Sequence, residues 1–88
     1  MPKTPKARFT PAYEEFLRLI VEARKTVGMN QVELAKRLHK PQPFVSKYER
    51  GVRRLDIVEC LLICRALGID ALHLIKKLIH SDAFKKTK

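Results

Sequence analysis

Two short helix-forming segments joined by a proline-containing turn constrain this chain more than any other feature. They lie within residues 29–51, whose sequence is MNQVELAKRLHKPQPFVSKYERG. Asn30 with Glu33 three residues later is a helix-capping pattern, and Gly51 stands where helices commonly end. The outer positions of the second helix are polar and basic. A helix of this kind, preceded by another short helix, suits the major groove of DNA.

Apolar residues spaced three to four apart predict a longer helix before this segment. Thr10 offers an N-cap, Pro11 suits the first helical position, and Gly28 is expected to end the helix. The positions expected to face inward are Tyr13, Phe16, Leu17, Ile20, Arg24 and Val27.

Two further helices are predicted after the segment. Asp56 with Glu59 forms a second capping pattern, and Gly68 is expected to end that helix. The apolar face predicted for it consists of Ile57, Leu61, Cys64 and Leu67. Asp70 is expected to cap a fifth helix that runs to about His80.

The whole chain is therefore expected to be all-α, with five helices in one compact domain over residues 10–80. No alternating strand pattern and no internal repeat is present. Residues 1–9 are expected to form a flexible basic arm, and residues 81–88 a frayed basic tail. The 88 residues leave room for a single core.

The balance of charge indicates a polyanionic partner. Nineteen lysines and arginines stand against nine aspartates and glutamates, and the formal net charge is +10. Helical proteins need no such excess for solubility, whereas it suits binding to nucleic-acid phosphates. No apolar run approaches the roughly 18–20 residues that span a bilayer, and the basic N-terminus is not followed by the apolar part of a secretion signal. We therefore expect a cytoplasmic protein with no membrane partner.

The cysteines and histidines indicate neither a metal site nor an active site. Cys60 and Cys64 are four residues apart on one helix and are expected to be small buried side chains. His39, His73 and His80 are scattered, and no carboxylate cluster accompanies them. We expect no cofactor, no bound metal and no enzymatic activity.

The residues of the two-helix segment also carry a resemblance to a known family. The pattern consists of Asn30, Gln31, Glu33, Leu34, Ala35, Gln42, Val45, Ser46, Glu49, Arg50, Gly51, Leu67, Gly68 and Ile69. It resembles the Xre-type helix-turn-helix family, which includes the lambdoid phage repressors and Cro proteins. The similarity covers about residues 16–79. It implies a lambda-repressor-like domain with the helix-turn-helix in its second and third helices.

The resemblance implies roles for the residues around the recognition helix, which is the second helix of the motif. Residues expected to contact bases are Gln42, Pro43, Phe44, Ser46 and Lys47. Residues expected to contact phosphates are Asn30, Gln31, Lys40, Arg50, Arg53 and Arg54. The Gln42 amide can donate and accept at N7 and N6 of adenine, and Gln31 is expected to brace it. Phe44 either meets a thymine methyl group or packs sideways on the protein.

The resemblance also implies a structural ion pair between Arg24 and Glu49, which ties the first helix to the recognition helix. Arg24 agrees with this role because it falls within an apolar stripe. Three positions depart from the family pattern. His39 replaces the usual glycine of the turn, Pro41 replaces a Ser or Thr cap, and Pro43 replaces a common polar base reader.

Together these features predict a sequence-specific transcriptional regulator, a repressor or autoregulator, that binds double-stranded DNA. We expect a homodimer on a palindromic operator. The residues expected to form the dimer contact lie on the fifth helix and are Leu74, Ile75, Leu78 and Ile79; the alternative is that these residues cover the first helix. The alternative is an antitoxin-like or adaptor module whose main partner is another regulatory protein, and the basic recognition surface argues against it.

Overall fold

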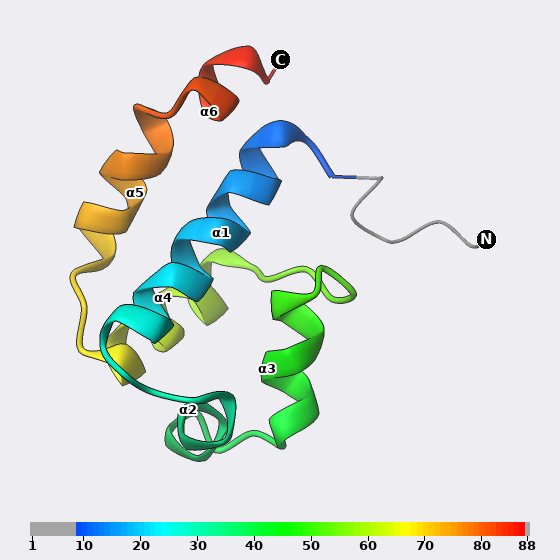
Figure 1. The fold of residues 1–88 in the computed structure, drawn as a ribbon, viewed down its shortest axis with the longest axis vertical. Helices are drawn as coiled ribbons and strands as arrows, with labels where there is room; N and C mark the ends of the chain where they lie inside the picture. Colours follow the sequence, from blue (N-terminus) through cyan, green and yellow to red (C-terminus); the bar gives the residue numbers. More distant parts are fainter. Residues whose placement is uncertain (1–8, 88) are drawn as a thin grey trace.

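The structure, a computed structural model, describes residues 9–87 and consists of helices joined by short turns (Figure 1). The helices are α1 Pro11–Thr26, α2 Gln31–Arg37, α3 Gln42–Glu49, α4 Ile57–Leu67, α5 Ala71–Ile79 and α6 Asp82–Lys86. Residues 9–87 contain no β-strand, so the all-α prediction is confirmed. None of these helices is both long and apolar enough to cross a membrane. The predicted basic arm lies outside the described residues except for Phe9.

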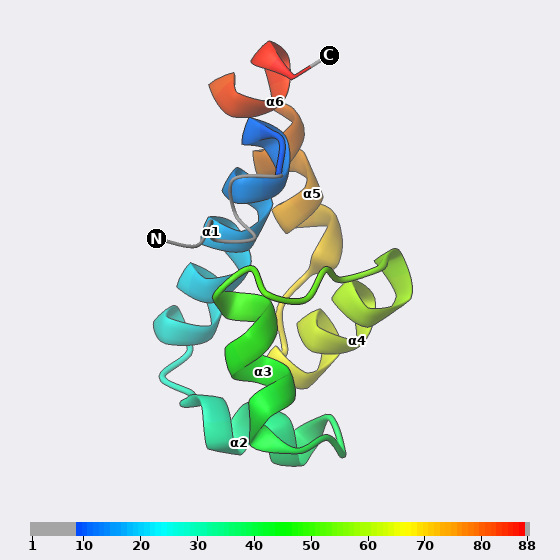
Figure 2. The same ribbon diagram turned by 90° about the vertical axis from the view of Figure 1, so that its right-hand side faces the viewer.

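The helices surround one core. α1 is the longest helix, with α5 and α6 along one side of it and α3 on the other (Figures 1 and 2). α2 and α3 pack together as the helix-turn-helix pair, and α4 packs against α2 and α5. The buried apolar residues are Leu17, Leu19, Ile20, Leu34, Ala35, Val45, Tyr48, Cys60, Ile63, Cys64, Leu67 and Leu74. Because α3 contributes only Val45 and Tyr48 to this core, much of its surface remains available to solvent.

Local capping chemistry places helix starts where the sequence predicts them. The Asn30 side chain accepts a hydrogen bond from the backbone N–H of Glu33 at 2.8 Å, and the Glu33 carboxylate accepts one from the N–H of Asn30 at 3.1 Å. Asp56 and Glu59 form the same reciprocal pair at 2.7 and 2.9 Å. Both predicted capping boxes are therefore confirmed. α3 begins without such help, because Pro41 has no side-chain cap to offer.

Four helices end in the same left-handed turn. The residues of positive φ that follow α1, α2, α3 and α4 are Gly28, His39, Gly51 and Gly68. After α2, the N–H of Lys40 donates to the carbonyl of Ala35 at 3.0 Å, and the N–H of His39 donates to the carbonyl of Lys36 at 3.1 Å. This is the Schellman pattern, which favours glycine at the left-handed position. His39 has a φ of 57°, so its β-carbon strains the turn between α2 and α3.

A sixth helix is the main difference from the predicted architecture. The sequence predicts a frayed tail over residues 81–88, whereas residues 82–86 form α6, which packs against α1. The Ser81 hydroxyl caps α6 by accepting a hydrogen bond from the N–H of Phe84 at 3.1 Å. The N–H of Ala12 donates to the Thr87 hydroxyl at 3.0 Å, which ties the end of the chain to the start of α1. A helix of five residues is too short to show a periodic pattern, so only its tertiary contacts reveal it.

The inner face of α4 also differs from the prediction. Its buried residues are Cys60, Ile63, Cys64 and Leu67. The two cysteines are buried and free, as expected, but Ile57 and Leu61 lie on the exposed side. On α1, Val27 is likewise exposed, and Leu19 is buried although the pattern does not include it. Most positions of α4 are apolar, so its periodicity does not distinguish the inner face from the outer face.

Replacement of His39 by glycine should stabilise the domain. A β-carbon in the left-handed region costs about 1–2 kcal/mol in the folded state. The greater freedom of glycine in the unfolded chain offsets roughly 0.5–1 kcal/mol of that gain. We expect the free energy of unfolding to rise by about 0.5–1 kcal/mol in His39→Gly and to fall in His39→Val, where the branched side chain adds strain. Urea unfolding followed by circular dichroism gives this order, and a glycine variant less stable than the parent would contradict it.

Candidate nucleic-acid interface

α3 lies along the side of the molecule that faces the viewer in Figure 2, and its outer side forms a surface open to solvent. Val45 and Tyr48 anchor the helix, and both are almost completely buried. Burial raises the pKa of the Tyr48 phenol above its ordinary value, so this side chain stays neutral. The residues on the exposed or partly exposed side of α3 include all five predicted base contacts, Gln42, Pro43, Phe44, Ser46 and Lys47.

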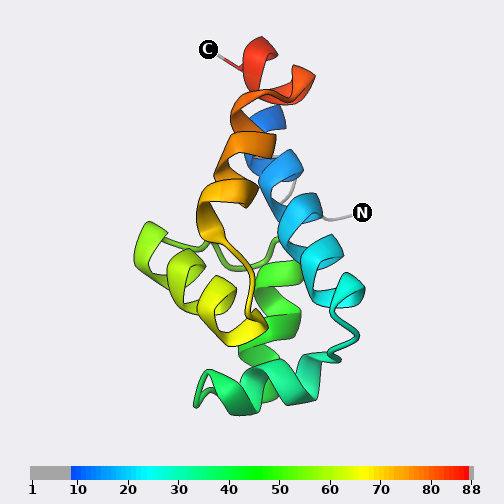
Figure 3. The same ribbon diagram turned by 90° about the vertical axis from the view of Figure 1, so that its left-hand side faces the viewer.

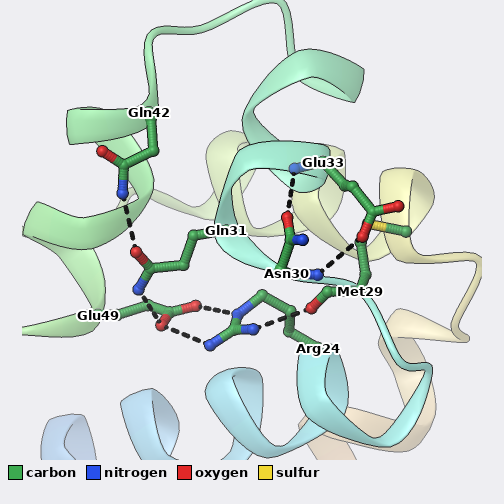
Figure 4. A network of polar contacts seen from close by, with 7 residues as sticks. All are labelled: Arg24, Met29, Asn30, Gln31, Glu33, Gln42 and Glu49. Carbon is green, nitrogen blue, oxygen red and sulfur yellow. Dashed lines mark hydrogen bonds and ion pairs between the residues drawn. The ribbon is translucent and has the colours of Figure 1, made fainter.

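An ion pair between α1 and α3 lies beneath this surface (Figure 4). Arg24 Nε donates to Glu49 Oε2 at 2.6 Å, and Arg24 Nη2 donates to Glu49 Oε1 at 3.0 Å. The two side chains are only 11% and 7% exposed. The hydrogen bond with Glu49 raises the pKa of Arg24, so the guanidinium remains charged. A bidentate pair at this depth holds the two helices in one relative position.

The same guanidinium holds the turn that leads into α2. Arg24 Nη1 donates to the backbone carbonyl of Met29 at 2.9 Å (Figure 4). Asn30, the next residue, is the N-cap of α2. One side chain of α1 therefore positions both the start of α2 and the end of α3, which together set the geometry of the helix-turn-helix.

A chain of hydrogen bonds continues from the ion pair to the first residue of α3 (Figure 4). Gln31 Nε2 donates to Glu49 Oε1 at 2.8 Å, and Gln42 Nε2 donates to Gln31 Oε1 at 2.9 Å. An ionised carboxylate only accepts hydrogen bonds, so Gln31 turns its NH₂ group toward Glu49 and its oxygen toward Gln42. Gln42 then turns its own NH₂ group toward Gln31. The buried carboxylate thus sets the orientation of the exposed Gln42 amide through one intervening side chain.

Phe44 packs along the protein surface instead of projecting from it. Its ring meets Tyr48 edge-on, with the ring centroids 5.6 Å apart. The Arg53 guanidinium carbon lies 4.9 Å from the Phe44 centroid, and Lys40 Nζ lies 5.4 Å from it. Of the two roles considered for Phe44, these contacts favour sideways packing, in which the ring supports basic groups at the edge of α3.

The two arginines after α3 are held by the domain itself. Arg53 forms an ion pair with Glu59 at 2.7 Å, and its hydrogen bond lowers the pKa of that carboxyl group. The Arg54 guanidinium carbon lies 4.0 Å from the centroid of the Tyr13 ring. The Tyr13 hydroxyl also accepts a hydrogen bond from the N–H of Leu55 at 2.9 Å. These contacts give both arginines a structural role. Both side chains also remain exposed, so they stay accessible for the predicted phosphate contact.

The other predicted phosphate contacts surround the two ends of α3. Lys40 and Arg50 are exposed at its start and end, and Arg50 Nε donates to the carbonyl of Ser46 at 3.3 Å. Asn30 is exposed, but its side-chain oxygen is engaged in the α2 cap. Gln31 is partly buried by its place in the hydrogen-bond chain. The structure therefore brings these residues around α3, with Asn30 and Gln31 also engaged within the fold.

The residues predicted to form a dimer contact on α5 divide between the core and the surface. Leu74 belongs to the core and Leu78 packs against it. Ile75 is partly buried, and Ile79 is exposed. Leu74 is therefore not available to a second chain, because its side chain already packs inside the domain.

The three histidines stay apart in the structure. His39, His73 and His80 are all exposed, at the end of α2, on α5 and after α5. Among residues 9–87, no three His, Cys, Asp or Glu side chains come together as a metal site would require. The groups that converge near α3 are instead amides, a guanidinium and the Glu49 carboxylate, which are joined by hydrogen bonds.

Comparison with known proteins identifies the class to which this arrangement belongs. A helix-turn-helix family model matches residues 20–74, which is more than half of the chain. The chain belongs to the XRE family of helix-turn-helix proteins, a family of DNA-binding transcription regulators. The resemblance drawn from the sequence is therefore confirmed.

Two solved structures are similar over most of the chain. An XRE-family like protein from Pseudomonas syringae pv. tomato str. DC3000 is 48% identical, with a TM-score of 0.73, and the match covers 76% of this chain and 84% of that one. A mutant of the Restriction-Modification Controller Protein C.Esp1396I is 28% identical, with a TM-score of 0.70, and the match covers 77% of this chain and 86% of that one. No curated protein gives a significant match.

Removal of Arg24 should destabilise the domain far more than removal of Arg18, a matched arginine on the same helix. Arg24→Ala leaves the Glu49 carboxylate buried without its partner, which costs about 3–5 kcal/mol. Arg18 pairs with Glu15 and Glu22 at the surface, where such pairs contribute at most about 1 kcal/mol. Urea unfolding of the two variants measures both losses. Equal decreases in the free energy of unfolding would show that the buried Arg24–Glu49 pair stabilises the domain no more than the surface pairs of Arg18.

Proposed function

We propose that this protein is a sequence-specific transcriptional regulator, acting as a repressor or autoregulator, that binds a palindromic operator as a homodimer. Each α3 would enter one major groove. The observation that carries the proposal is the oriented amide of Gln42 at the exposed start of α3. The similarity to a restriction-modification controller protein supports a regulatory role.

The orientation of the Gln42 amide suits an adenine edge. One of its amide hydrogens is donated to Gln31, which leaves the second hydrogen and Oε1 for a base. Oε1 can accept from adenine N6 while Nε2 donates to N7. Guanine would place its O6 acceptor opposite Oε1, and the hydrogen bond to Gln31 opposes a flip of the amide. The proposed readout therefore depends on an orientation that the fold imposes.

Phosphate contacts would supply most of the affinity. The formal net charge of +10 favours association with a duplex, and basic side chains lie at both ends of α3. Lys40 before α3 and Arg50 after it are exposed, while Arg53 and Arg54 are exposed but held in place by Glu59 and aromatic rings. Such groups position α3 on the duplex without reading sequence.

Replacement of Gln42 by alanine should remove sequence preference while leaving general DNA affinity in place. The measurement is fluorescence anisotropy on DNA from upstream of the gene, with a scrambled duplex as control, across roughly 50–200 mM salt. We expect the parent to prefer the upstream DNA by about 10³-fold or more, as dedicated regulators do. The affinity of Gln42→Ala for the upstream DNA should fall by roughly 10–100-fold, and its affinity for the scrambled duplex should change little. Equal affinity of the parent for both duplexes would refute an autoregulatory operator binder.

Replacement of Lys40, a predicted phosphate contact, by alanine should weaken binding and lower the dependence of affinity on salt. Loss of one phosphate contact reduces the slope of log affinity against log salt by about one. Lys77→Ala is the matched control, because Lys77 is exposed and belongs to α5, which lies on the opposite side of α1 from α3 (Figure 1). We expect the control to retain the parental slope. A larger effect of Lys77→Ala would mean that the duplex binds a different face.

A further inference from the structure

The outer side of α4 is apolar and exposed. Ile57, Val58, Leu61 and Leu62 are 61%, 59%, 44% and 40% exposed, and we refer to these four residues as the α4 patch. They lie at i, i+1, i+4 and i+5, so they are adjacent on two successive helical turns. The other side of α4 is packed in the core. A helix that is apolar on both sides is normally buried on both sides, so we expect another chain to cover the patch.

The α4 patch belongs to a helix that lies beside α3 instead of opposite to it. In Figure 2, which looks toward the exposed side of α3, α4 forms the right-hand edge of the molecule. In the opposite view of Figure 3, α5 is in front and α4 forms the left-hand edge. A two-fold axis beside α4 leaves both copies of α3 on the same side, as one duplex requires. Pairing through the outer side of α5 would turn the two α3 helices away from each other.

The dimensions of the domain agree with pairing beside α4. The principal extents are 35 × 35 × 21 Å, and the shortest of them runs horizontally in Figure 2, with α4 at one end. Two copies whose α4 axes are about 8–10 Å apart would have their centres roughly 25–30 Å apart. Successive major grooves on one face of DNA are about 34 Å apart. The separation of the two centres is therefore of the same order as the groove spacing.

The α4 patch has a negative charge at one end and a positive charge at the other, so two antiparallel copies bring opposite charges together. Asp56 precedes the patch, and Arg65 follows Leu61 by one turn on the same side of α4. Both are exposed, and the patch itself contains no charge. In an antiparallel pair of α4 helices, Arg65 lies toward Asp56 of the partner subunit, and the helix dipoles also oppose each other. Pairing in this direction therefore places opposite charges at each end of the patch, although the formal net charge of the chain is +10.

We infer that the α4 patch is the surface through which two copies of this chain pair, antiparallel and related by a two-fold axis. The partner is thus a second copy, and the contact on α5 predicted from sequence is replaced by one on α4. This inference rests on the proposed function, because a regulator that reads a palindrome needs both α3 helices on one side.

Serine substitutions on the two helices test the inference without changing charge. Ile57→Ser with Val58→Ser removes the two most exposed side chains of the α4 patch, and Leu72→Ser with Ile79→Ser makes the matched change on the outer side of α5. Sedimentation equilibrium should find the parent at twice the chain mass of 10.2 kDa. We expect the dimer dissociation constant to rise about tenfold or more in the α4 variant, because exposed apolar area is no longer buried, and to stay unchanged in the α5 variant.

A charge reversal provides a second test that does not depend on the folding of the first variant. Arg65→Glu places a negative charge toward Asp56 of the partner subunit and should raise the dimer dissociation constant. Lys77→Glu makes the same change of charge on α5 and should not. Circular dichroism checks that each variant keeps its helices.

The outcomes separate this inference from the proposed function. If only the α5 substitutions weaken the dimer, the α4 inference is wrong and a homodimeric regulator still stands. A parent chain that stays monomeric at all concentrations, with or without operator DNA, overturns both. If the α4 variants weaken the dimer but the parent shows no preference between upstream and scrambled DNA, the α4 inference stands and the proposed function fails.

Discussion

The Glu49 carboxylate is buried between α1 and α3, and both the packing of the helices and the shape of the interface depend on how it is satisfied. A buried carboxylate requires a charged partner and further hydrogen bonds, because water cannot solvate it. Arg24 supplies two hydrogen bonds and Gln31 supplies a third. These partners come from α1 and α2, so one charge holds three helices together. The same requirement orients Gln31 and, through it, Gln42. Stability of the domain and orientation of the proposed base-reading amide are therefore two consequences of one interaction.

The basic loop after α3 shows how a positively charged surface can also stabilise the fold. Arg53 uses its guanidinium for Glu59 and lies over Phe44, and Arg54 lies over Tyr13. A planar guanidinium can stack on a ring and still have N–H groups to donate at its edge, which lysine cannot do in the same way. Arginines restrained in this manner lose less conformational entropy when they bind an anion. Net charge alone does not reveal this restraint, because it depends on which ring or carboxylate lies beside each side chain.

The sequence was a good guide wherever local chemistry decides the structure. Asn30 and Asp56 begin helices because each finds a backbone N–H three residues later, and a pattern in the sequence is enough to see it. Position His39 adopts the left-handed conformation expected of a glycine at that turn. On α4, Cys64 and Leu67 are buried as predicted but Ile57 and Leu61 are not, because an apolar residue at nearly every position gives no dominant period. α6 was missed because five residues carry too little periodicity, and it is held by contacts with α1.

What the sequence by itself determined is the number and limits of the longer helices, the family pattern and the excess of positive charge, because these depend on residues near one another in the chain. Tertiary structure alone decided which side of α4 remains exposed, that Arg54 lies over Tyr13, and that Leu74 lies in the core. It also decided the direction of the hydrogen bonds from Glu49 to Gln42. The physical reason is that a side chain far along the sequence supplies the partner in each case. Only the packed structure shows whether the two side chains are in contact.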